Sequence, residues 1–573
     1  MALIDKASLL MVPSTYEDGT LYNVLPSGNK APDETGNHNG YDQTRADFTF
    51  SRGSNLAATR VNADGLIEKG RENLLLQSNQ FDTTWATNNA SVTSGQSGYD
   101  GSSDAWKLQS SSAGINYLYQ IISNNAVQTF SIYAKAGNTD WMRINILQSG
   151  TNANNYYDIA NGVKGASPSA PIIEDKIEGV GNGWYRISIV VNISITQIRI
   201  QTAVADGNET SASGDNIFIQ SAQLEKGLIA TDYIETGSST AQAGILEDMP
   251  RINYDANGEN GALLLESSRT NKWIHSEYLD YSFSAISQAT TTQNTSETKS
   301  PEGVYNATKL AGTSTWSFRD SLAGTDTGTW TISCYVKAVD ANDKNTFRLS
   351  VSGNNFSSNL TATSEWKRFS FTVTDGGNTN AGLLRDTGGN DADLYIYGFQ
   401  VEAGSYASSL IPTHGAAVTR GADVPNILGD SSVIGQSEGT LFFDAYFDIN
   451  DRINISLSDS TSSNHITIDS SSNKAVFAYV QQGGSSQATI STGNDYFELG
   501  ERLKCAIGYK ANDFVFYING TQIGTDTSGS VPTCDDIRFA RYNGALAATQ
   551  RVRQAALFDT RLTNSELATL TTL

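Results

Sequence analysis

The sequence predicts an all-β chain of tandem β-sandwiches that follow an extended N-terminal arm. Three observations predict this fold. Apolar and polar residues alternate with a period of two over many short runs, and no helical period persists through them. Turns rich in Gly, Ser, Thr and Asn separate these runs. A long block of the chain also recurs, and at 573 residues the chain is too long for a single core.

The recurring block contains the same strand-like runs in the same order. TFSIYAK from Thr129 matches TISCYVK from Thr331, a Trp-x-Arg run follows in both copies, and each copy closes with Gln-x-Glu-x-Gly. In the first of these runs Phe130, Ile132 and Ala134 share one face. This alternation is typical of antiparallel strands with one face on a core. About eight such strands in roughly 150 residues predict a jelly roll.

Short hairpins are expected before the repeated units, and a third sandwich is expected after them. The runs from Thr59 and Pro250 contain the tight-turn elements ADG and ANG, and a related run begins at Thr419. From Glu438, strand-like runs lead to a short helix capped by Thr563 or Asn564. The predicted organisation is an arm with a hairpin over 1–72, a jelly roll over 73–236, a linker hairpin over 237–270, a second jelly roll over 271–414, a linker over 415–437, and a terminal sandwich over 438–573.

The charge argues against nucleic acid as a partner. The formal net charge is −22, which repels phosphate backbones and anionic membranes. The N-terminus is not a secretory signal, because Asp5 interrupts its apolar run, and no run is long enough to cross a bilayer. We therefore expect a soluble chain with no nucleic acid partner and no membrane insertion.

The residues that usually carry catalysis form no recognisable motif. The four histidines have no metal-ligand spacing, and neither a nucleophile elbow nor a phosphate-binding loop is present. Cys505 and Cys534 fall in the same predicted domain and would either pair or remain reduced, whereas Cys334 is expected to be a small buried residue. A glycosidase needs only two carboxylates, but the sequence singles out no such pair. We therefore expect a protein that is not an enzyme.

Saccharide binding needs exposed aromatic rings surrounded by polar groups. Aromatic residues outside the core alternation are candidates. Trp184 and Trp366 are also expected on the face opposite the apolar one, beside Arg186 and Arg368. The alternative is that these rings cover a sheet edge or pack on a neighbouring domain or subunit. The predicted ligand-binding residues are Tyr117, Tyr119, Trp141, Trp316 and Phe318.

Aspartates in Gly- and Asn-rich loops also suit a structural Ca²⁺, although such residues are common in ordinary turns. No other cofactor is expected. The aspartates concerned are Asp206, Asp215, Asp386, Asp391 and Asp393.

Several of these segments resemble known families. Residues 73 to about 236 and 271 to about 414 resemble the carbohydrate-binding-module-like jelly rolls of bacteriophage virion proteins, through NLLLQSNQFDTTW, the Trp-x-Arg strand and QVEAGSYASSLIPTHGAAVTRGADV. Residues 438–573 resemble a laminin-G/concanavalin-A-like lectin domain, through EGTLFFDAYF, FYINGTQIG and AALFDTRLTNSELATL. Together the resemblances cover most of the chain.

These resemblances imply a phage tail or capsid fibre that binds a host cell-surface glycan for adsorption. The arm would attach it to other virion proteins, and such fibres are usually homo-oligomers, most often trimers. The chain would be made in the host cytoplasm and end up in the virion. Two alternatives remain open: a purely structural capsid-decoration or tail-assembly component, and a tailspike that depolymerises glycan.

Overall fold

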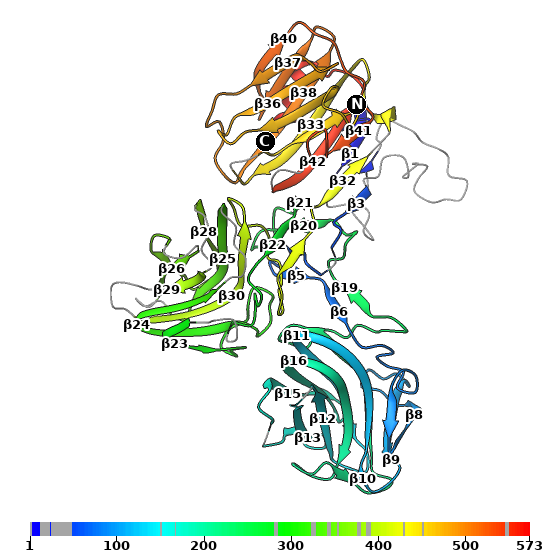
Figure 1. The fold of residues 1–573 in the computed structure, drawn as a ribbon. Coiled ribbons are helices and arrows are strands. Elements are labelled where there is room, and N and C mark those ends of the chain that lie inside the picture. Colours follow the sequence, from blue (N-terminus) through cyan, green and yellow to red (C-terminus); the bar gives the residue numbers. More distant parts are fainter. Residues whose placement is uncertain are drawn as a thin grey trace, which may run out of the picture. The chain divides into compact units, whose positions relative to one another are not determined.

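The protein is described by a computed structural model, which confirms the predicted all-β fold of tandem sandwiches (Figure 1). The chain forms two compact units. Unit 1 comprises Met1–Lys69, Ile245–Arg269 and Thr419–Leu573; unit 2 comprises Gly70–Gly244 and Thr270–Val418. The described residues are 3–11, 23–24, 49–54, 56–148, 150, 152–166, 168–279, 285–321, 328–340, 345–351, 355–374, 380–384, 391–427, 430–449, 452–544 and 549–573.

Unit 2 contains the two predicted jelly rolls. In the first, the long curved strands β11 and β16 pair antiparallel along most of their length (Figure 1). The sheet order is β14-β13-β12-β16-β11-β18-β9-β8, with β15 on β16 and β7 on β11. The strands are β6 (Arg71–Asn73), β7 (Ala86–Asn88), β8 (Ala90–Gln96), β9 (Ala105–Ser110), β10 (Gly114–Ile115), β11 (Tyr117–Ala136), β12 (Trp141–Leu147), β13 (Asn152–Asp158), β14 (Val163–Lys164), β15 (Ile172–Gly181), β16 (Trp184–Ala203), β17 (Thr210–Ser211), β18 (Asn216–Lys226) and β19 (Ala241–Ala243).

The second jelly roll repeats this plan with shorter strands. Its sheet order is β27-β26-β29-β24-β30-β25-β28, with β23 on β24. The core is apolar in both copies, with Phe130 and Ile132 in the first matched by Ile332 and Cys334 in the second. The strands are β23 (Ala285–Thr292), β24 (Thr308–Ser321), β25 (Thr329–Ala338), β26 (Thr346–Ser350), β27 (Leu360–Thr361), β28 (Lys367–Thr374), β29 (Asn380–Leu384) and β30 (Ala392–Ala403).

The recurring Gln-x-Glu motif holds the loop that follows it. In the first jelly roll, Gln223 Nε2 donates to Glu225 Oε1 at 2.7 Å, and Glu225 Oε1 also accepts from the backbone N–H of Thr231 at 2.8 Å. The second copy has the same bonds, from Gln400 to Glu402 at 2.6 Å and from the N–H of Ser408 at 2.8 Å. The motif is therefore structural in both copies.

A buried asparagine ties the entry of each jelly roll to its last strand. Asn73 Nδ2 donates to the carbonyls of Ala222 and Ile234, and its Oδ1 accepts from the N–H groups of Leu75 and Leu224. In the second copy Asn271 makes the equivalent four bonds. This explains why an Asn follows Arg-x in both repeats.

Unit 1 is a sandwich of a nine-stranded and a seven-stranded sheet. The first has the order β2-β1-β42-β33-β38-β39-β40, with β20 and β21 added through β42, and the second the order β3-β32-β41-β34-β35-β36-β37. The strands are β1 (Leu9–Met11), β2 (Asn23–Val24), β3 (Thr49–Ser51), β20 (Arg251–Asn253), β21 (Ala262–Leu265), β32 (Val424–Ile427), β33 (Glu438–Phe447), β34 (Ile455–Ser458), β35 (His465–Ser470), β36 (Val476–Gln482), β37 (Ser485–Ser491), β38 (Glu501–Lys510), β39 (Phe514–Ile518), β40 (Thr521–Asp526), β41 (Asp536–Arg538) and β42 (Gln550–Phe558).

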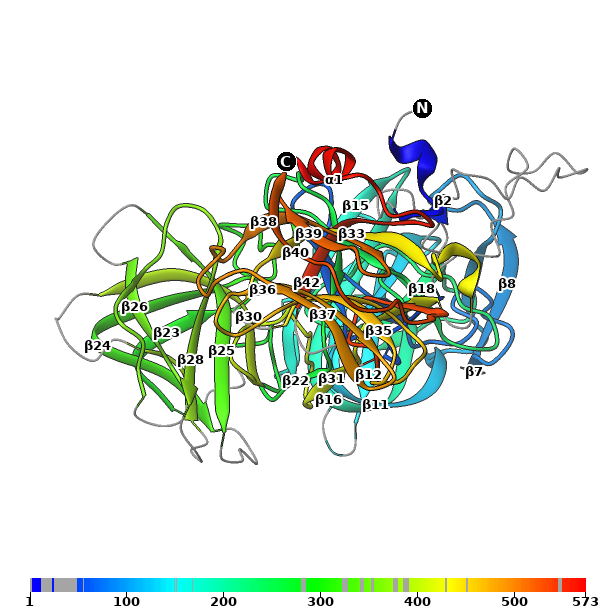
Figure 2. The ribbon, with the colours of Figure 1, turned by 90° about the horizontal axis from the view of Figure 1, so that it is seen from above.

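The terminal sandwich therefore includes strands from far outside residues 438–573. From the predicted N-terminal arm, β1 pairs with β42 and β3 pairs with β32. The helix α1 (Asn564–Thr571) lies against β38 and β39 (Figure 2), and Thr563 caps it in a reciprocal capping box with Glu566. Glu566 also pairs with Lys6 of the short 3-10 helix Leu3–Lys6. The described part of the arm is thus integral to unit 1.

The two predicted hairpin turns pack on each other within unit 1. Gly65 follows β4 (Thr59–Val61) and precedes β5 (Ile67–Lys69), and Gly258 lies between β20 and β21. Both glycines have positive φ, +74° and +73°. A Cβ on Gly65 would lie 2.2 Å from the carbonyl oxygen of Ala256, and one on Gly258 would lie 1.9 Å from that of Ala63. The repeated turns are therefore glycine because of a mutual close approach.

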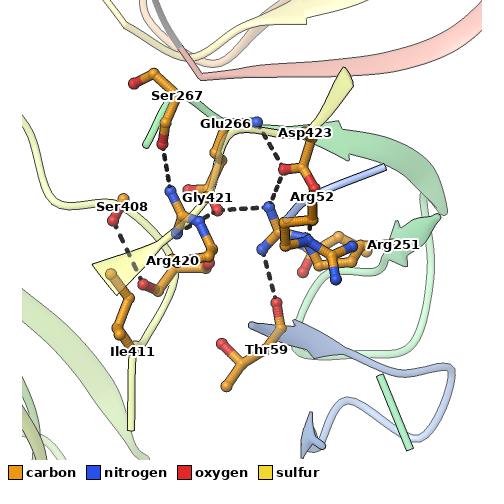
Figure 3. Close-up of polar contacts among 12 residues, drawn as sticks. Arg52, Thr59, Arg251, Glu266, Ser267, Ser408, Ile411, Arg420, Gly421 and Asp423 are labelled. Carbon is orange, nitrogen blue, oxygen red and sulfur yellow. Dashed lines mark hydrogen bonds and ion pairs between the residues drawn. The ribbon is translucent and has the colours of Figure 1, made fainter. Parts of the chain in front are cut away.

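Five charged side chains form a buried network in unit 1 (Figure 3). Arg52 Nε donates to Asp423 Oδ1 at 2.8 Å, and Arg251 pairs with both Asp423 and Glu266. Arg420 Nη1 lies 2.9 Å from Glu266 Oε2. All five side chains are buried. The network joins β3, β20 and the segment before β32, which come from three separate stretches of the chain.

We expect Asp423→Asn to destabilise unit 1 by about 3–5 kcal/mol, because it leaves the buried Arg52 without a counter-charge and Arg251 with Glu266 alone. All eight tryptophans lie in unit 2, so their fluorescence is not a reporter of unit 1. Hydrogen exchange of β33 and β42 in urea should show the loss, with the fluorescence transition unchanged. The control Asp495→Asn removes a carboxylate that is 80% exposed and should have little effect. Equal protection in Asp423→Asn and the wild type would contradict the network's role.

Asn73→Ala should destabilise the first jelly roll by about 2–4 kcal/mol, because four buried backbone groups lose their partner. Tryptophan fluorescence during urea unfolding measures this directly. Thr87→Ala is the control, since Thr87 lies on the exposed strand β7 of the same jelly roll. An unchanged midpoint for Asn73→Ala would show that water replaces the asparagine without loss.

Candidate functional site

One outer face of the first jelly roll carries polar and aromatic side chains where strands β11, β16, β12 and β13 lie side by side. Alternation turns Met142 and Ile144 of β12 into the core, so Arg143 and Asn145 point to the other side. The register places Tyr119 opposite Arg199, and Arg199 opposite Asn145. We call this surface the tyrosine face; it comprises Tyr117, Tyr119, Trp141, Arg143, Asn145, Asn154, Tyr156, Arg199 and Gln201.

Two tyrosines form the aromatic part of this face. The rings of Tyr117 and Tyr119 lie 5.5 Å apart between centroids at an angle of 60°, and both are half-buried. The guanidinium of Arg199 lies over the Tyr117 ring at 4.2 Å and is held by a 2.6 Å hydrogen bond from its Nε to Gln197 Oε1. Tyr117 is thus fixed by a cation–π contact on one face of its ring.

The floor of the tyrosine face is polar and buried. Arg143 Nη1 donates to Gln201 Oε1 at 3.0 Å and pairs with Glu209, while its guanidinium lies 5.5 Å from the Tyr156 ring centroid. Burial raises the pKa of Tyr156, so its hydroxyl stays protonated near neutral pH. The floor therefore offers hydrogen-bond donors and acceptors that are fixed by the neighbouring strands.

Two atoms of this floor have no hydrogen-bond partner in the described part of the chain. They are Nε of Arg143 and Oδ1 of Asn145, and the Asn145 side chain belongs to a residue that is only 4% exposed. A buried polar atom without a partner costs about 1–3 kcal/mol. One is a donor and the other an acceptor, and they lie two residues apart on one strand. Both atoms are shielded from solvent, so a hydroxyl group of a ligand reaches them only after neighbouring side chains shift.

Three of the five predicted ligand-binding residues share this face. Tyr117 and Tyr119 are in contact, and Trp141 lies half-buried at the end of β12, opposite Ala203 and Asp158. Trp316 belongs to β24, but its side chain falls outside the described residues.

The expectation that Phe318 is exposed is wrong. It is fully buried in the core of the second jelly roll, with its ring centroid 6.4 Å from that of Phe399. Trp184 is also buried, against Tyr133, and Trp366 donates from Nε1 to the carbonyl of Lys299 at 2.8 Å. Trp184 therefore packs within its own jelly roll, whereas Trp366 remains half-buried.

The polar floor was missed at the sequence level, although a signal was present. In WMRINIL the apolar Met142, Ile144 and Ile146 alternate with residues that include Arg143 and Asn145, and the neighbouring run NANNYYD is rich in Asn and Tyr. Polar residues are ordinary on an outer face, so this pattern alone does not indicate a site. The pairing of β12 with β16 is what collects Arg143, Asn145 and Gln201 at one place.

No metal site accompanies this face. The described residues hold no group of three or more His, Cys, Asp or Glu side chains that could bind a metal ion. Asp206 accepts from the N–H of Ala166 in another loop, and Asp215 accepts from that of Ala212 as a turn residue does. Asp386 lies outside the described residues. Asp391 and Asp393 lie on a shallow depression beside β23. The three cysteines are unpaired and buried.

Comparison with known proteins finds similar solved structures among carbohydrate-binding modules and lectins. The CBM40 module of a Ruminococcus gnavus IT-sialidase, bound to α2,3-sialyllactose, is 13% identical over 24% of this chain and 84% of its own, with a TM-score of 0.22. The tandem CBM22 modules of Paenibacillus barcinonensis Xyn10C are 7% identical over 62% of this chain and 100% of theirs, with a TM-score of 0.20. CG-16, a homodimeric agglutinin from chicken liver, is 10% identical over 23% of this chain and 89% of its own, with a TM-score of 0.14.

No protein-family model and no curated protein matches the chain. Within its described residues, the chain has no helix with the length and apolar character needed to cross a membrane. The case for function therefore rests on the residues of the tyrosine face.

Proposed function

We propose that the chain is a glycan-binding protein without catalytic activity, and that the tyrosine face of the first jelly roll holds the saccharide. The observation that carries this proposal is the pairing of half-exposed rings with a buried polar floor. Tyr117 and Tyr119 offer apolar ring surface on which the C–H face of a pyranose stacks. Nε of Arg143 and Oδ1 of Asn145 take hydroxyl groups as partners once the side chains that shield them shift.

The aromatic rings and amide groups of the face suit an uncharged saccharide. Arg143 is neutralised by Glu209, and Arg199, which keeps its positive charge, is held by Tyr117 and Gln197. The remaining polar groups are neutral amides and hydroxyls.

The carboxylates at this face support a binding role over a catalytic one. Glu209 is paired with Arg143, and Asp158 accepts hydrogen bonds from the N–H groups of Ala160 and Asn161. Glycoside hydrolysis needs one carboxyl group that is protonated and a second that is free to act as base or nucleophile. A carboxylate already bonded in a turn or an ion pair suits neither task.

For the biological setting we propose a phage tail or capsid fibre that uses this binding for adsorption to the host. The sequence resemblance of both jelly rolls to virion modules supports this role, above all QVEAGSYASSLIPTHGAAVTRGADV. In this proposal the chain is made in the host cytoplasm, joins other virion proteins through its N-terminal residues, and assembles as a homo-oligomer, most simply a trimer.

We expect the double variant Tyr117→Ala/Tyr119→Ala to bind its glycan about tenfold or more weakly, because each lost stacking contact is worth about 0.5–1.5 kcal/mol. The full chain is first screened on a glycan array of bacterial surface polysaccharides, and affinities are then measured by calorimetry. Tyr305→Ala is the control, since Tyr305 is a tyrosine of the second jelly roll that is 43% exposed and lies far from this face in sequence. Unchanged affinity in the double variant, or the release of reducing ends from the bound glycan, would overturn the proposal.

The virion role has its own test. Purified phage particles from the source of this sequence should contain the chain in a fixed copy number, and antibodies against residues 1–72 should react with disrupted particles more strongly than with intact ones. Antibodies against the first jelly roll should label intact particles and block adsorption. If the chain binds glycan but is absent from the particles, the virion role is contradicted while the glycan-binding role stands.

A further inference from the structure

The outer side of the seven-stranded sheet in unit 1 carries a second collection of aromatic and charged side chains. His465, Thr467 and Asp469 of β35 alternate with the apolar Ile466 and Ile468 and so share this side, and the register sets them opposite Gln481, Tyr479 and Phe477 of β36. These three cross-strand pairs lie next to one another, and their six side chains point away from the core. The outer side of an antiparallel sheet usually carries polar residues, so a histidine and two aromatic rings there indicate a further role.

The segment after β41 partly covers this block and makes a pocket of it. Ser456 Oγ donates to the carbonyl of Ala540, and Ser458 Oγ donates to that of Tyr542, so the segment is held across the sheet. It places Tyr542 on the ring of His465, with centroids 4.5 Å apart and planes at 14°. Tyr479 stacks near the same imidazole at 5.5 Å and 28°. The cavity measures about 330 Å³ and is lined by Arg452, Ser462, His465, Thr467, Asp469, Phe477, Tyr479, Gln481, Arg541 and Tyr542.

We call this cavity around His465 the histidine pocket, and its side chains carry one positive charge that no acid among the described residues cancels. Arg452 Nη1 donates to Asp469 Oδ2 at 2.6 Å, so these two charges cancel. Burial lowers the pKa of His465, which keeps the imidazole neutral near pH 7. The Arg541 side chain makes no hydrogen bond or ion pair with any described residue, although its charge acts on His465 and Asp469 nearby, and it is half-buried at the wall of the pocket. The nearby acids are engaged elsewhere, because Asp536 pairs with Arg538 and Asp459 accepts from Thr461 and Asn464.

We propose that the histidine pocket binds an acidic sugar residue, a pyranose that carries one carboxylate. The guanidinium of Arg541 takes the carboxylate, since its planar fork matches two carboxylate oxygens. The rings of Tyr479, Tyr542 and Phe477 supply the apolar wall for the pyranose. Gln481 and Thr467 are placed to bond its hydroxyl groups. A volume of about 330 Å³ is at the lower end for small-molecule sites and suits one or two sugar units.

This site is independent of the tyrosine face. It belongs to unit 1, whereas the tyrosine face belongs to unit 2, and it selects for charge where the other selects for neutral hydroxyl groups. The chain would then recognise two chemically different parts of a polysaccharide that contains both neutral and acidic sugars.

The test uses the full chain with a glucuronic acid tetrasaccharide and, as its neutral counterpart, the same tetrasaccharide after carboxyl reduction. Calorimetry should show that the wild type prefers the acidic form by tenfold or more, and that Arg541→Ala removes this preference. Arg553→Ala is the matched control, since Arg553 lies on β42 in the other sheet of the same unit. Because the preference is electrostatic, it should shrink as salt rises from 50 to 500 mM.

Three outcomes would overturn the inference: equal affinity of the wild type for the acidic and the neutral tetrasaccharide, an undiminished preference in Arg541→Ala, and loss of the preference in Arg553→Ala. Circular dichroism of each variant checks that the fold is intact, and Tyr542→Ala gives a second variant that should weaken both forms alike. Tyr117→Ala/Tyr119→Ala should keep the acidic preference in full, so failure at the tyrosine face and failure at the histidine pocket remain distinguishable.

Discussion

The buried ion network of Arg52, Arg251, Glu266, Arg420 and Asp423 is the constraint on which unit 1 depends (Figure 3). Removing five charges from water is costly, and only mutual pairing and hydrogen bonds to backbone carbonyls offset that cost. Each arginine finds such a carbonyl: Leu246 and Met249 for Arg52, Thr59 for Arg251, and Ser267 for Arg420. A network of this kind has one satisfactory arrangement. It therefore fixes how three distant stretches of the chain meet.

The repeats show which residues serve the fold and which remain free for function. Asn73 and Asn271, and the paired Gln-x-Glu motifs, make the same hydrogen bonds in both jelly rolls. Arg186 and Arg368 likewise donate to the serine on the neighbouring strand, Ser131 and Ser333. These recurring residues hold loops and strand ends in place. Arg143 and Asn145 of the polar floor do not belong to this set of recurring residues. They lie on the outer side of β12, where the core does not require an apolar residue.

Much of the fold could be predicted from the sequence, and less of the candidate site. Alternation with a period of two is a local property, so it predicted strands such as TFSIYAK and, from their number, the sandwich class. Phe318 was predicted to lie outside the core alternation, but a shift of one residue exchanges the two faces of a strand. Tyr117 and Tyr119 point outward while Phe318 points inward.

The histidine pocket was beyond sequence analysis for a different reason. His465 and Tyr542 are far apart in the chain, and their stacking depends on how the segment after β41 crosses β34. No local pattern encodes such a crossing. The arm raised the same difficulty, because only strand pairing shows that Leu9–Met11 belongs with β42 at the other end of the chain.

The short pair of β6 and β19 has a consequence for how such a chain evolves. Ala241 lies opposite Asn73, and Ala243 lies opposite Arg71, so the first jelly roll begins and ends at adjacent points. A module whose ends meet can be replaced by another of the same design without altering the path of the chain on either side. Recombination at this pair would therefore exchange one ligand specificity for another as a cassette, while the ion network and the sandwich of unit 1 are inherited intact.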